Sequence, residues 1–317
     1  MRLHPASTSH HPPALELAAG FAAIYFVWGS TFLAIRVAVE GMPPFLMAGT
    51  RFLSAGAFLY VWRRWGHGEK PEPRHWPGAA LVGTLLFMGC NGAVTWSEQR
   101  VPSGLTALML ATIPLWMVLL DAMSRPRGSS PGVASPLNAR VMTGVVLGIA
   151  GLAILLGPGK LLGSRELEPM GAVVLLGGSI CWATGSLISR WIPQARPSAL
   201  AAGMQMLTGG AVLLLASTAT GELSRVTSAA LGVRAILALL YLIVFGSVIG
   251  FTAYTWLLSV TSPARVSTYA FVNPVIAVLL GWVLAGEPLS ARTLLASAVI
   301  VVAVAMIISF RPAPSPG

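Results

Sequence analysis

Long runs of apolar residues, separated by short polar segments, recur along the whole sequence. Most runs have roughly the 20 residues with which an α-helix crosses the hydrocarbon core of a bilayer. Polar and apolar positions do not alternate within a run, as they do in membrane β-strands. The pattern therefore predicts an all-α integral membrane protein with ten transmembrane helices. They are expected at Leu15–Val39, Pro44–Trp62, Trp76–Ser97, Ser103–Asp121, Val141–Gly157, Met170–Arg190, Ser198–Thr218, Val233–Ser259, Ala264–Ala285 and Ala291–Phe310.

The composition also indicates a membrane protein. Charged residues make up 9% of the 317-residue chain, whereas they make up about 25% of a typical soluble protein. Apolar residues make up 55%. A soluble fold of this length could not cover its surface with so few charges, so the composition excludes that class.

The basic residues predict orientation rather than a polyanionic partner. The formal net charge is +10, but a nucleic-acid partner needs a contiguous basic face. Here the Lys and Arg residues stand in small groups between the apolar runs, so we expect no nucleic acid. Placing both termini in the cytoplasm puts most of these residues on the cytoplasmic side, where membrane proteins carry them. The first run is too long for a signal-peptide core, so we expect a retained span.

The two halves of the sequence resemble each other. At a fixed offset, Trp, Arg, Pro and Gly positions of the first half meet the same residue types in the second. The matched pairs include Trp28 with Trp182, Arg36 with Arg190, Pro43 with Pro197, Gly49 with Gly203 and Gly56 with Gly210 and, at a slightly larger offset, Pro114 with Pro274. Because each half holds an odd number of predicted helices, the second must enter the membrane from the opposite face. The sequence thus predicts two inverted five-helix repeats, related by a pseudo-two-fold axis in the membrane plane.

These repeats divide the chain into five predicted parts. They are a cytoplasmic N-terminal tail (1–13), the first repeat (14–157), a linker (158–169), the second repeat (170–310) and a C-terminal tail (311–317). Pro, Gly and charged residues gather in the linker, as is typical of a connection between structural units.

Short motifs at matching places in the two halves resemble those of the EamA repeat in the drug/metabolite transporter superfamily. In the first half the motifs are Trp28–Ser30, Arg51–Leu53, Val101–Leu105 and Thr112–Leu115. In the second half they are Ser262–Ala264, Asn273–Val275 and Gly286–Ser290. The likeness extends from about Gly20 to Phe310. It departs from the family pattern in two places: no Gly-Glu-Pro-Leu-Ser counterpart follows Leu120, and Gln205 stands where Arg51 would recur.

The resemblance implies a transporter of the bacterial inner membrane that exports small organic metabolites, amino acids or drugs. It also implies alternating access, in which the two repeats rock about a central cavity. Uptake, or flipping of a lipid-linked substrate, is an alternative that the same architecture allows. A membrane accessory protein whose cavity carries nothing is an alternative of another class. The expected partners are a small-molecule substrate and the lipid bilayer. Whether two copies of the chain form a homodimer is left undecided by the sequence.

Two prolines and two asparagines inside the predicted spans are candidates for the walls of that cavity. Pro114 and Pro274 stand near the centres of the fourth and ninth spans, where a proline leaves backbone carbonyls free. A simple kink is the alternative. Asn91 and Asn273 are costly in lipid unless they face protein or water. They are expected either to contact substrate or to bond a neighbouring helix.

Aromatic residues in the span interiors form a second set of candidates. Trp28 and Trp182 lie near the centres of the first and sixth spans, away from the interfacial belt where Trp concentrates. Paired across the pseudo-axis, they could stack on an aromatic or cationic substrate, or they could fill the core. Nearby hydroxyl groups could contact substrate or bond back to their own helices. These hydroxyl groups belong to Ser30, Thr31 and Thr184. The further aromatic candidates are Trp96, Tyr254 and Tyr269, of which Trp96 and Tyr254 could instead be interface anchors.

Arg51 stands about two turns, roughly 10 Å, inside the second predicted span. A charge at this depth is expected to serve a purpose. It could attract a carboxylate or phosphate substrate, or it could pair with Glu40 or Glu98 as a structural lock. Arg36 lies nearer the end of its span and is expected to snorkel to the interface.

Residue types that common membrane enzymes need are absent from the sequence. There is no P-loop motif, Asp121 is the only aspartate, and no histidine follows His75. These absences exclude P-loop ATP hydrolysis, an aspartyl-protease pair and a serine-type triad in the membrane. We therefore expect no enzyme, no cofactor and no metal site. No carboxylate or histidine stands at a span centre, so we expect facilitated or exchange transport, unless a residue outside this pattern couples protons.

Overall fold

The computed structural model describes residues 13–99, 106, 109–124, 139–156, 169–225, 232–285 and 290–308. These residues form helices joined by short connections, and no strand occurs among them. The all-α prediction is therefore confirmed for the described part of the chain. Several predicted features lie wholly or almost wholly outside it: the two tails, the linker, the motif Val101–Leu105 and the segment Gly286–Leu289.

Most helices of the first half begin and end close to the predicted boundaries, but α7 begins ten residues after the predicted start of the fourth span, Ser103. In chain order they are α1 (Ala14–Ala22), η1 (Ala23–Val27) and α2 (Trp28–Gly41); α3 (Pro44–Val61) and η2 (Trp62–Gly66); α4 (His75–Gly83), η3 (Thr84–Gly92) and α5 (Ala93–Ser97); α7 (Ile113–Met123); and α8 (Ala139–Leu156). Pro44 occupies the first turn of α3, where a missing backbone N–H removes no helical hydrogen bond.

Helices of the second half follow the predicted order as well. They are α10 (Pro169–Trp191); α11 (Ser198–Ala219) and the short 3₁₀-helix η4 (Glu222–Arg225); α12 (Val233–Tyr241), η5 (Leu242–Ile249) and α13 (Gly250–Val260); α14 (Pro263–Val266) and α15 (Tyr269–Ala285); and α16 (Ala291–Ile308). Ser290 caps α16, because its hydroxyl oxygen accepts the backbone N–H of Thr293 at 3.2 Å.

Within the described residues, six helical segments are long and apolar enough to cross a membrane. They are Ala14–Gly41, Pro44–Gly66, His75–Ser97, Met170–Trp191, Ser198–Ala219 and Val233–Val260. Shorter apolar helices occupy Ile113–Met123, Ala139–Ile154 and Ala291–Ile307. The chain is therefore a multi-pass membrane protein, while the count of ten spans and their inverted arrangement stay predictions.

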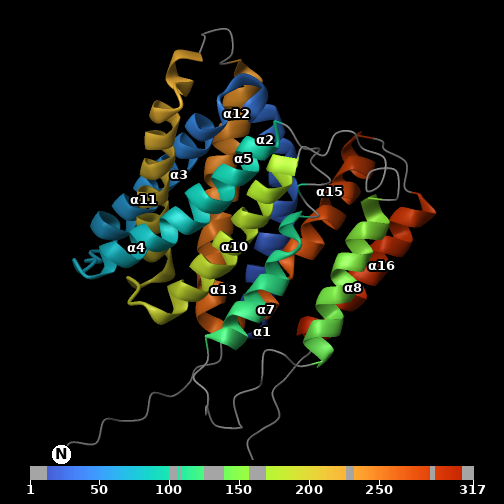
Figure 1. Cartoon of the computed structure of the whole chain (residues 1–317). Helices are drawn as coiled ribbons and strands as arrows, with labels where there is room; N and C mark the ends of the chain where they lie inside the picture. The colour runs from blue at the N-terminus through green and yellow to red at the C-terminus, as the bar shows by residue number, and fades with distance from the viewer. Residues whose placement is uncertain are drawn as a thin grey trace, which may run out of the picture.

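Two helix pairs pack closely because glycines lie between them: α3 runs against α11, and α8 against α16 (Figure 1). A Cβ at Gly56 of α3 would lie 2.6 Å from the backbone nitrogen of Leu207. A Cβ at Gly210 of α11 would likewise lie 2.6 Å from the backbone nitrogen of Leu53. At Gly144 of α8, a Cβ would lie 2.7 Å from a side-chain carbon of α16. Small residues at such positions let helix backbones approach each other in membranes.

Three of the long helices contain an internal π-helical segment, which the apolar pattern did not predict. η1 precedes Trp28, η3 forms the middle of the span His75–Ser97, and η5 lies within Val233–Val260. In a π-helix the backbone N–H bonds to the fifth residue back instead of the fourth, so nearby carbonyls lose their usual partners. Such segments are frequent at functional sites.

The two candidate prolines do not occupy equivalent positions, contrary to the prediction. Pro274 lies inside α15, as expected. Pro114 lies in the first turn of α7, after a turn at Ala111 and Thr112 that interrupts the fourth predicted span. A proline is tolerated there because the N–H of the first turn has no helical partner to lose. The placement of Pro114 near a helix centre was therefore wrong.

Candidate functional site

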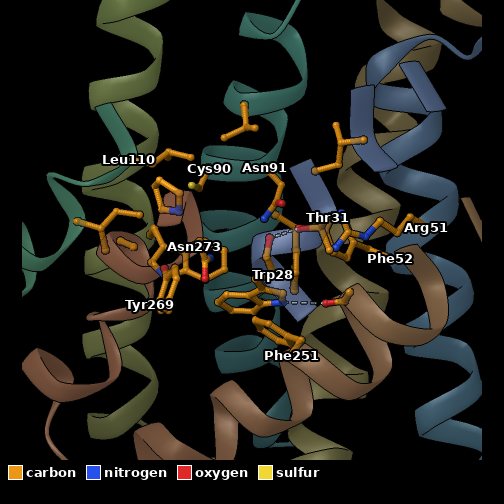
Figure 2. A pocket seen from close by; sticks show the side chains of 18 residues that line it. Trp28, Thr31, Arg51, Phe52, Cys90, Asn91, Leu110, Phe251, Tyr269 and Asn273 are labelled. Atoms are coloured by element: carbon orange, nitrogen blue, oxygen red, sulfur yellow. Dashed lines mark hydrogen bonds between the residues drawn. The ribbon is translucent and has the colours of Figure 1, made fainter. Parts of the chain in front are cut away.

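A cavity of about 780 Å³, counted with its open mouth, lies where helices from both halves of the chain meet (Figure 2). Its wall comes from α2, α3, η3, α5 and α7 of the first half and from α10, η5, α13 and α15 of the second. Apolar side chains with a few placed polar groups are usual for small-molecule sites. The lining residues are Trp28, Thr31, Ile35, Arg51, Phe52, Phe87, Cys90, Asn91, Val94, Leu110, Ile113, Trp182, Gly246, Phe251, Tyr269, Ala270, Asn273 and Pro274.

Trp28 forms the middle of the wall seen in Figure 2. Its ring meets Trp182 and Tyr269 edge to face, with centroid distances of 5.7 and 4.8 Å. The indole N–H donates to the carbonyl of Gly246 at 3.0 Å. A side chain at Gly250 would collide with the indole nitrogen, so this glycine makes room for the ring. The two tryptophans that the repeat paired are thus in contact, and both line the cavity.

Tyr254 lies behind the cavity wall and is not among the residues that line it. Its side chain is fully buried. Trp182 Nε1 donates to the tyrosine hydroxyl oxygen at 2.8 Å, and the hydroxyl of Ser186 lies 2.5 Å from the same oxygen. Tyr254 therefore holds Trp182 in its orientation.

Arg51 projects from α3 into the cavity and is only 5% exposed. Its Nε donates to the hydroxyl oxygen of Ser247 on η5 at 2.8 Å. The guanidinium carbon lies 4.6 Å from the ring centroid of Phe52. The guanidinium of Arg51 is thus held by a hydrogen bond from Nε and by the ring face of Phe52.

Within the described residues, no contact ion pair joins Arg51 to either carboxylate that was predicted as its partner. The ion pairs there join Arg63 to Glu69 and Arg74 to Glu72. Glu40 is exposed. Glu98 acts on Arg51 through charge at longer range. The structural lock is therefore not formed.

Glu98, which the sequence offered as a possible partner of Arg51, is a titratable group with an unexpected environment. It follows directly on the span that ends at Ser97. Both of its carboxyl oxygens are buried and lack a hydrogen-bond partner in the described part of the protein. Burial raises the pKa of Glu98 to about 8, and the positive charges of Arg36 and Arg51 oppose that rise. A carboxylate at a span end would ordinarily be expected in water.

The two asparagines of the wall donate to backbone carbonyls. Asn91 Nδ2 donates to the carbonyl of Leu86, five residues earlier in η3, at 3.0 Å. The Asn273 side chain, oriented with its nitrogen toward η1, donates to the carbonyls of Tyr25 and Tyr269, each at 3.1 Å. Asn273 therefore bonds a neighbouring helix, which was one of its two predicted roles, and it also lines the cavity.

Each internal π-helical segment thus has a carbonyl that accepts a bond from a cavity-lining side chain. The acceptors are Tyr25 in η1, Leu86 in η3 and Gly246 in η5. Because a buried carbonyl without a hydrogen-bond partner is unfavourable, these side-chain hydrogen bonds stabilise the π-helical segments. The irregular backbone and the polar wall of the cavity form one structure.

The other predicted candidates divide between lining and non-lining positions. Thr31 lines the cavity, and its hydroxyl donates back to the carbonyl of Trp28 at 2.7 Å. Ser30 donates to the carbonyl of Val27 at 2.7 Å and also bonds the hydroxyl of Tyr241. Back-bonding is therefore confirmed for both. The candidates that line the cavity are Trp28, Thr31, Arg51, Asn91, Trp182, Tyr269, Asn273 and Pro274, and those that do not are Ser30, Trp96, Pro114, Thr184 and Tyr254.

Three phenylalanines of the cavity wall were not predicted from the sequence as site residues. Phe52 and Phe87 lie 4.3 Å apart between ring centroids, and Phe87 and Phe251 lie 4.8 Å apart. All three line the cavity. Nothing in an apolar helix separates such residues from ordinary core, so no signal could have identified them.

Comparisons with known proteins agree with the architecture. The chain matches the model of the EamA-like transporter family over residues 17–157 and again over 169–309. A relative from Escherichia coli (strain K12), "Uncharacterized inner membrane transporter YedA", is 40% identical over 295 residues, which are 92% of this chain and 90% of that protein. A relative from Salmonella typhimurium (strain LT2), "Probable amino-acid metabolite efflux pump", is 27% identical over 88% of this chain and 90% of that protein. A solved crystal structure shares the fold, with a TM-score of 0.72 and 22% identity over 92% of this chain and 97% of the other.

The matches confirm the family resemblance inferred from the motifs. Both relatives are named as transport proteins, which fits the expectation that this chain is not an enzyme. The helices that can cross a membrane and the inner-membrane relative together make this a multi-pass protein of the inner membrane. With the family model matched twice along its length, the chain belongs to the EamA-like transporter family.

Proposed function

We propose that this protein exports small organic metabolites by alternating access, with the cavity between its two halves as the substrate site. The observation that carries the proposal is the composition of the wall, to which five elements of the first half and four of the second contribute. A site held between two halves is exposed to one side of the membrane or the other as the halves rock.

Ten spans in two inverted five-helix repeats are part of the proposal. Support comes from reciprocal contacts between equivalent residues: Gly56 meets Leu207, and Gly210 meets Leu53. Gly56 is equivalent to Gly210, and Leu207 is equivalent to Leu53, so the second contact is the first one with the two halves exchanged. A two-fold axis produces reciprocal contacts of this kind. The two equivalent tryptophans of the cavity also contact each other.

Orientation and direction of transport rest on separate grounds. Both termini are assigned to the cytoplasm because most Lys and Arg residues then lie on that side. Export is favoured over uptake by the name of the Salmonella relative, an efflux pump for amino-acid metabolites. The cavity suits a small molecule with an apolar body in either direction.

The test is to overexpress the chain in a bacterium and to compare metabolites inside and outside the cells with those of an empty-vector strain. Asn273→Leu removes the donor that bonds the carbonyls of Tyr25 and Tyr269. Trp65→Ala is the matched control, because Trp65 is 71% exposed. Both variants are checked for membrane insertion.

Export predicts compounds that accumulate outside only with the wild-type chain and with Trp65→Ala. Accumulation inside the cells would instead indicate uptake. No change on either side, with insertion verified, would favour the accessory role and contradict the proposal.

A further inference from the structure

Arg51 brings a positive charge into the cavity that no contacting carboxylate balances among the described residues. Its Nε is occupied by the hydroxyl of Ser247. The guanidinium has two further nitrogens that can donate. Gly246 leaves room for one of these nitrogens, Nη2, because a Cβ on residue 246 would lie 2.7 Å from it. Figure 2 shows the guanidinium pointing from α3 toward Thr31, with Asn273 on the far side of Trp28.

The rest of the described wall carries no formal charge. None of its lining residues is an aspartate, a glutamate or a histidine. A bound organic cation would therefore lack a counter-charge, whereas an anion would meet the donors of Arg51. A charge taken out of water needs such a partner, so the cavity selects for anions.

The second half of the chain indicates that the fold does not need this charge. Gln205 stands on α11 at the position equivalent to Arg51 and is likewise buried. Its Nε2 donates to Oε1 of Gln194 at 2.9 Å. A neutral amide is therefore compatible with the equivalent place in the helix packing, and the guanidinium of Arg51 has a purpose beyond packing.

The remaining wall defines the body of the ligand. The rings of Trp28, Trp182 and Tyr269 contact one another, and Phe52 lies beneath the guanidinium. Aromatic faces of this kind favour an apolar or aromatic ligand body. A planar carboxylate matches the parallel N–H groups of a guanidinium. One cation balances one negative charge, which favours a monocarboxylate over a phosphate dianion.

We propose that Arg51 binds the carboxylate of a small organic anion whose apolar body lies against Trp28 and Tyr269. The assignment rests on the transport function proposed above, since it makes the carboxylate the recognised group of the transported molecule. It defines the substrate class as amphiphilic monocarboxylates.

The test measures binding to the purified full chain in detergent by titration calorimetry. The probes are 3-phenylpropanoate, its neutral amide 3-phenylpropanamide and the cation 3-phenylpropylamine, which share one apolar body. Hydrogen bonds to charged groups predict that the anion binds about tenfold to a hundredfold more tightly than the amide. Inorganic phosphate should not displace it.

Arg51→Gln copies the residue of the second half and should abolish the preference for the anion. Arg51→Lys should keep part of it, because the charge remains while the planar fork is lost. Arg36→Gln is the control, since Arg36 is exposed and does not line the cavity. It should bind all three probes like the wild type.

Four results would overturn the proposal: equal or tighter binding of the amide or the amine, no binding of the anion at millimolar concentration, displacement of the anion by phosphate, or an intact anion preference in Arg51→Gln. If Arg51→Gln does not fold, the comparison of the three probes on the wild-type chain still decides. Binding is measured without transport, so the two proposals fail separately. Anion binding without flux in cells removes the export function and keeps the site, whereas flux without anion preference removes the site alone.

Discussion

Gly246 lies where two cavity side chains converge, so one added methyl group tests how the cavity is built. In Gly246→Ala, the new Cβ would lie 2.7 Å from Arg51 Nη2 and 3.0 Å from Thr31 Cγ2. Ordinary van der Waals contact begins near 3.4 Å. One or both side chains must therefore move by several tenths of an ångström.

The expected cost has three parts. Overpacking of this kind destabilises by about 1–3 kcal/mol. Displacing the guanidinium also breaks the 2.8 Å bond from Arg51 Nε to Ser247, and a hydrogen bond from a charged donor contributes about 1.5–3 kcal/mol. Alanine recovers about 1 kcal/mol through its higher helix propensity. The net destabilisation should be about 1.5–5 kcal/mol.

The assay is thermal unfolding in detergent, followed by intrinsic fluorescence, together with the affinity for 3-phenylpropanoate. Gly177→Ala on α10 is the matched control, because nothing lies within 4 Å of a Cβ at that position. Its midpoint should stay the same or rise. In an Arg51→Gln background, Gly246→Ala should cost less, since Nη2 is then absent. If Gly246→Ala matched Gly177→Ala in midpoint and affinity, the reasoning would be refuted.

Three further predictions follow from the same contacts. Burial raises the pKa of Glu98 to about 8, so its carboxyl is neutral at pH 7 and becomes negative as the pH rises through about 8. That charge would oppose a carboxylate at Arg51, so calorimetry should show weaker 3-phenylpropanoate binding at high pH, and a pH profile for Glu98→Gln that was not flatter would contradict this. Trp28→Phe leaves the Gly246 carbonyl without its 3.0 Å donor and should lower the unfolding midpoint by the equivalent of about 1–3 kcal/mol; an unchanged midpoint would argue against a structural role for that bond. Gly56→Ala places a Cβ 2.6 Å from a backbone nitrogen of α11. Because a backbone atom cannot move away as a side chain can, the variant should give a much lower yield of monodisperse protein than Gly177→Ala, and equal yields would disprove the close approach of the two helices.

The helices and one part of the cavity could be predicted because their signals are local or repeated. Burial in lipid requires long apolar runs, so the expected helix Pro44–Trp62 appears as α3, Pro44–Val61. The internal repeat pairs Trp28 with Trp182 on residue identity alone, and their rings are in contact. Arg51 stood out because a charge inside a span is costly.

The rest of the site depends on tertiary contacts that leave no mark in one sequence. A π-helical segment changes which carbonyl each N–H meets without changing which residues are apolar, so η1, η3 and η5 could not be seen in the pattern. The partner of Arg51, Ser247, is 196 residues away in the chain. Glu98 was predicted only as a possible partner of Arg51, and its position after a span end does not show that both of its carboxyl oxygens are buried.

The most direct test of transport through this cavity is flux in liposomes reconstituted with the purified chain. The transported compound is the one identified by the metabolite comparison, and the variants are Trp28→Ala in the cavity wall and Trp65→Ala on the exposed surface. The account predicts saturable flux for the wild type and Trp65→Ala, and no flux above empty liposomes for Trp28→Ala. Equal flux through Trp28→Ala, or no flux through the wild-type chain, would contradict it.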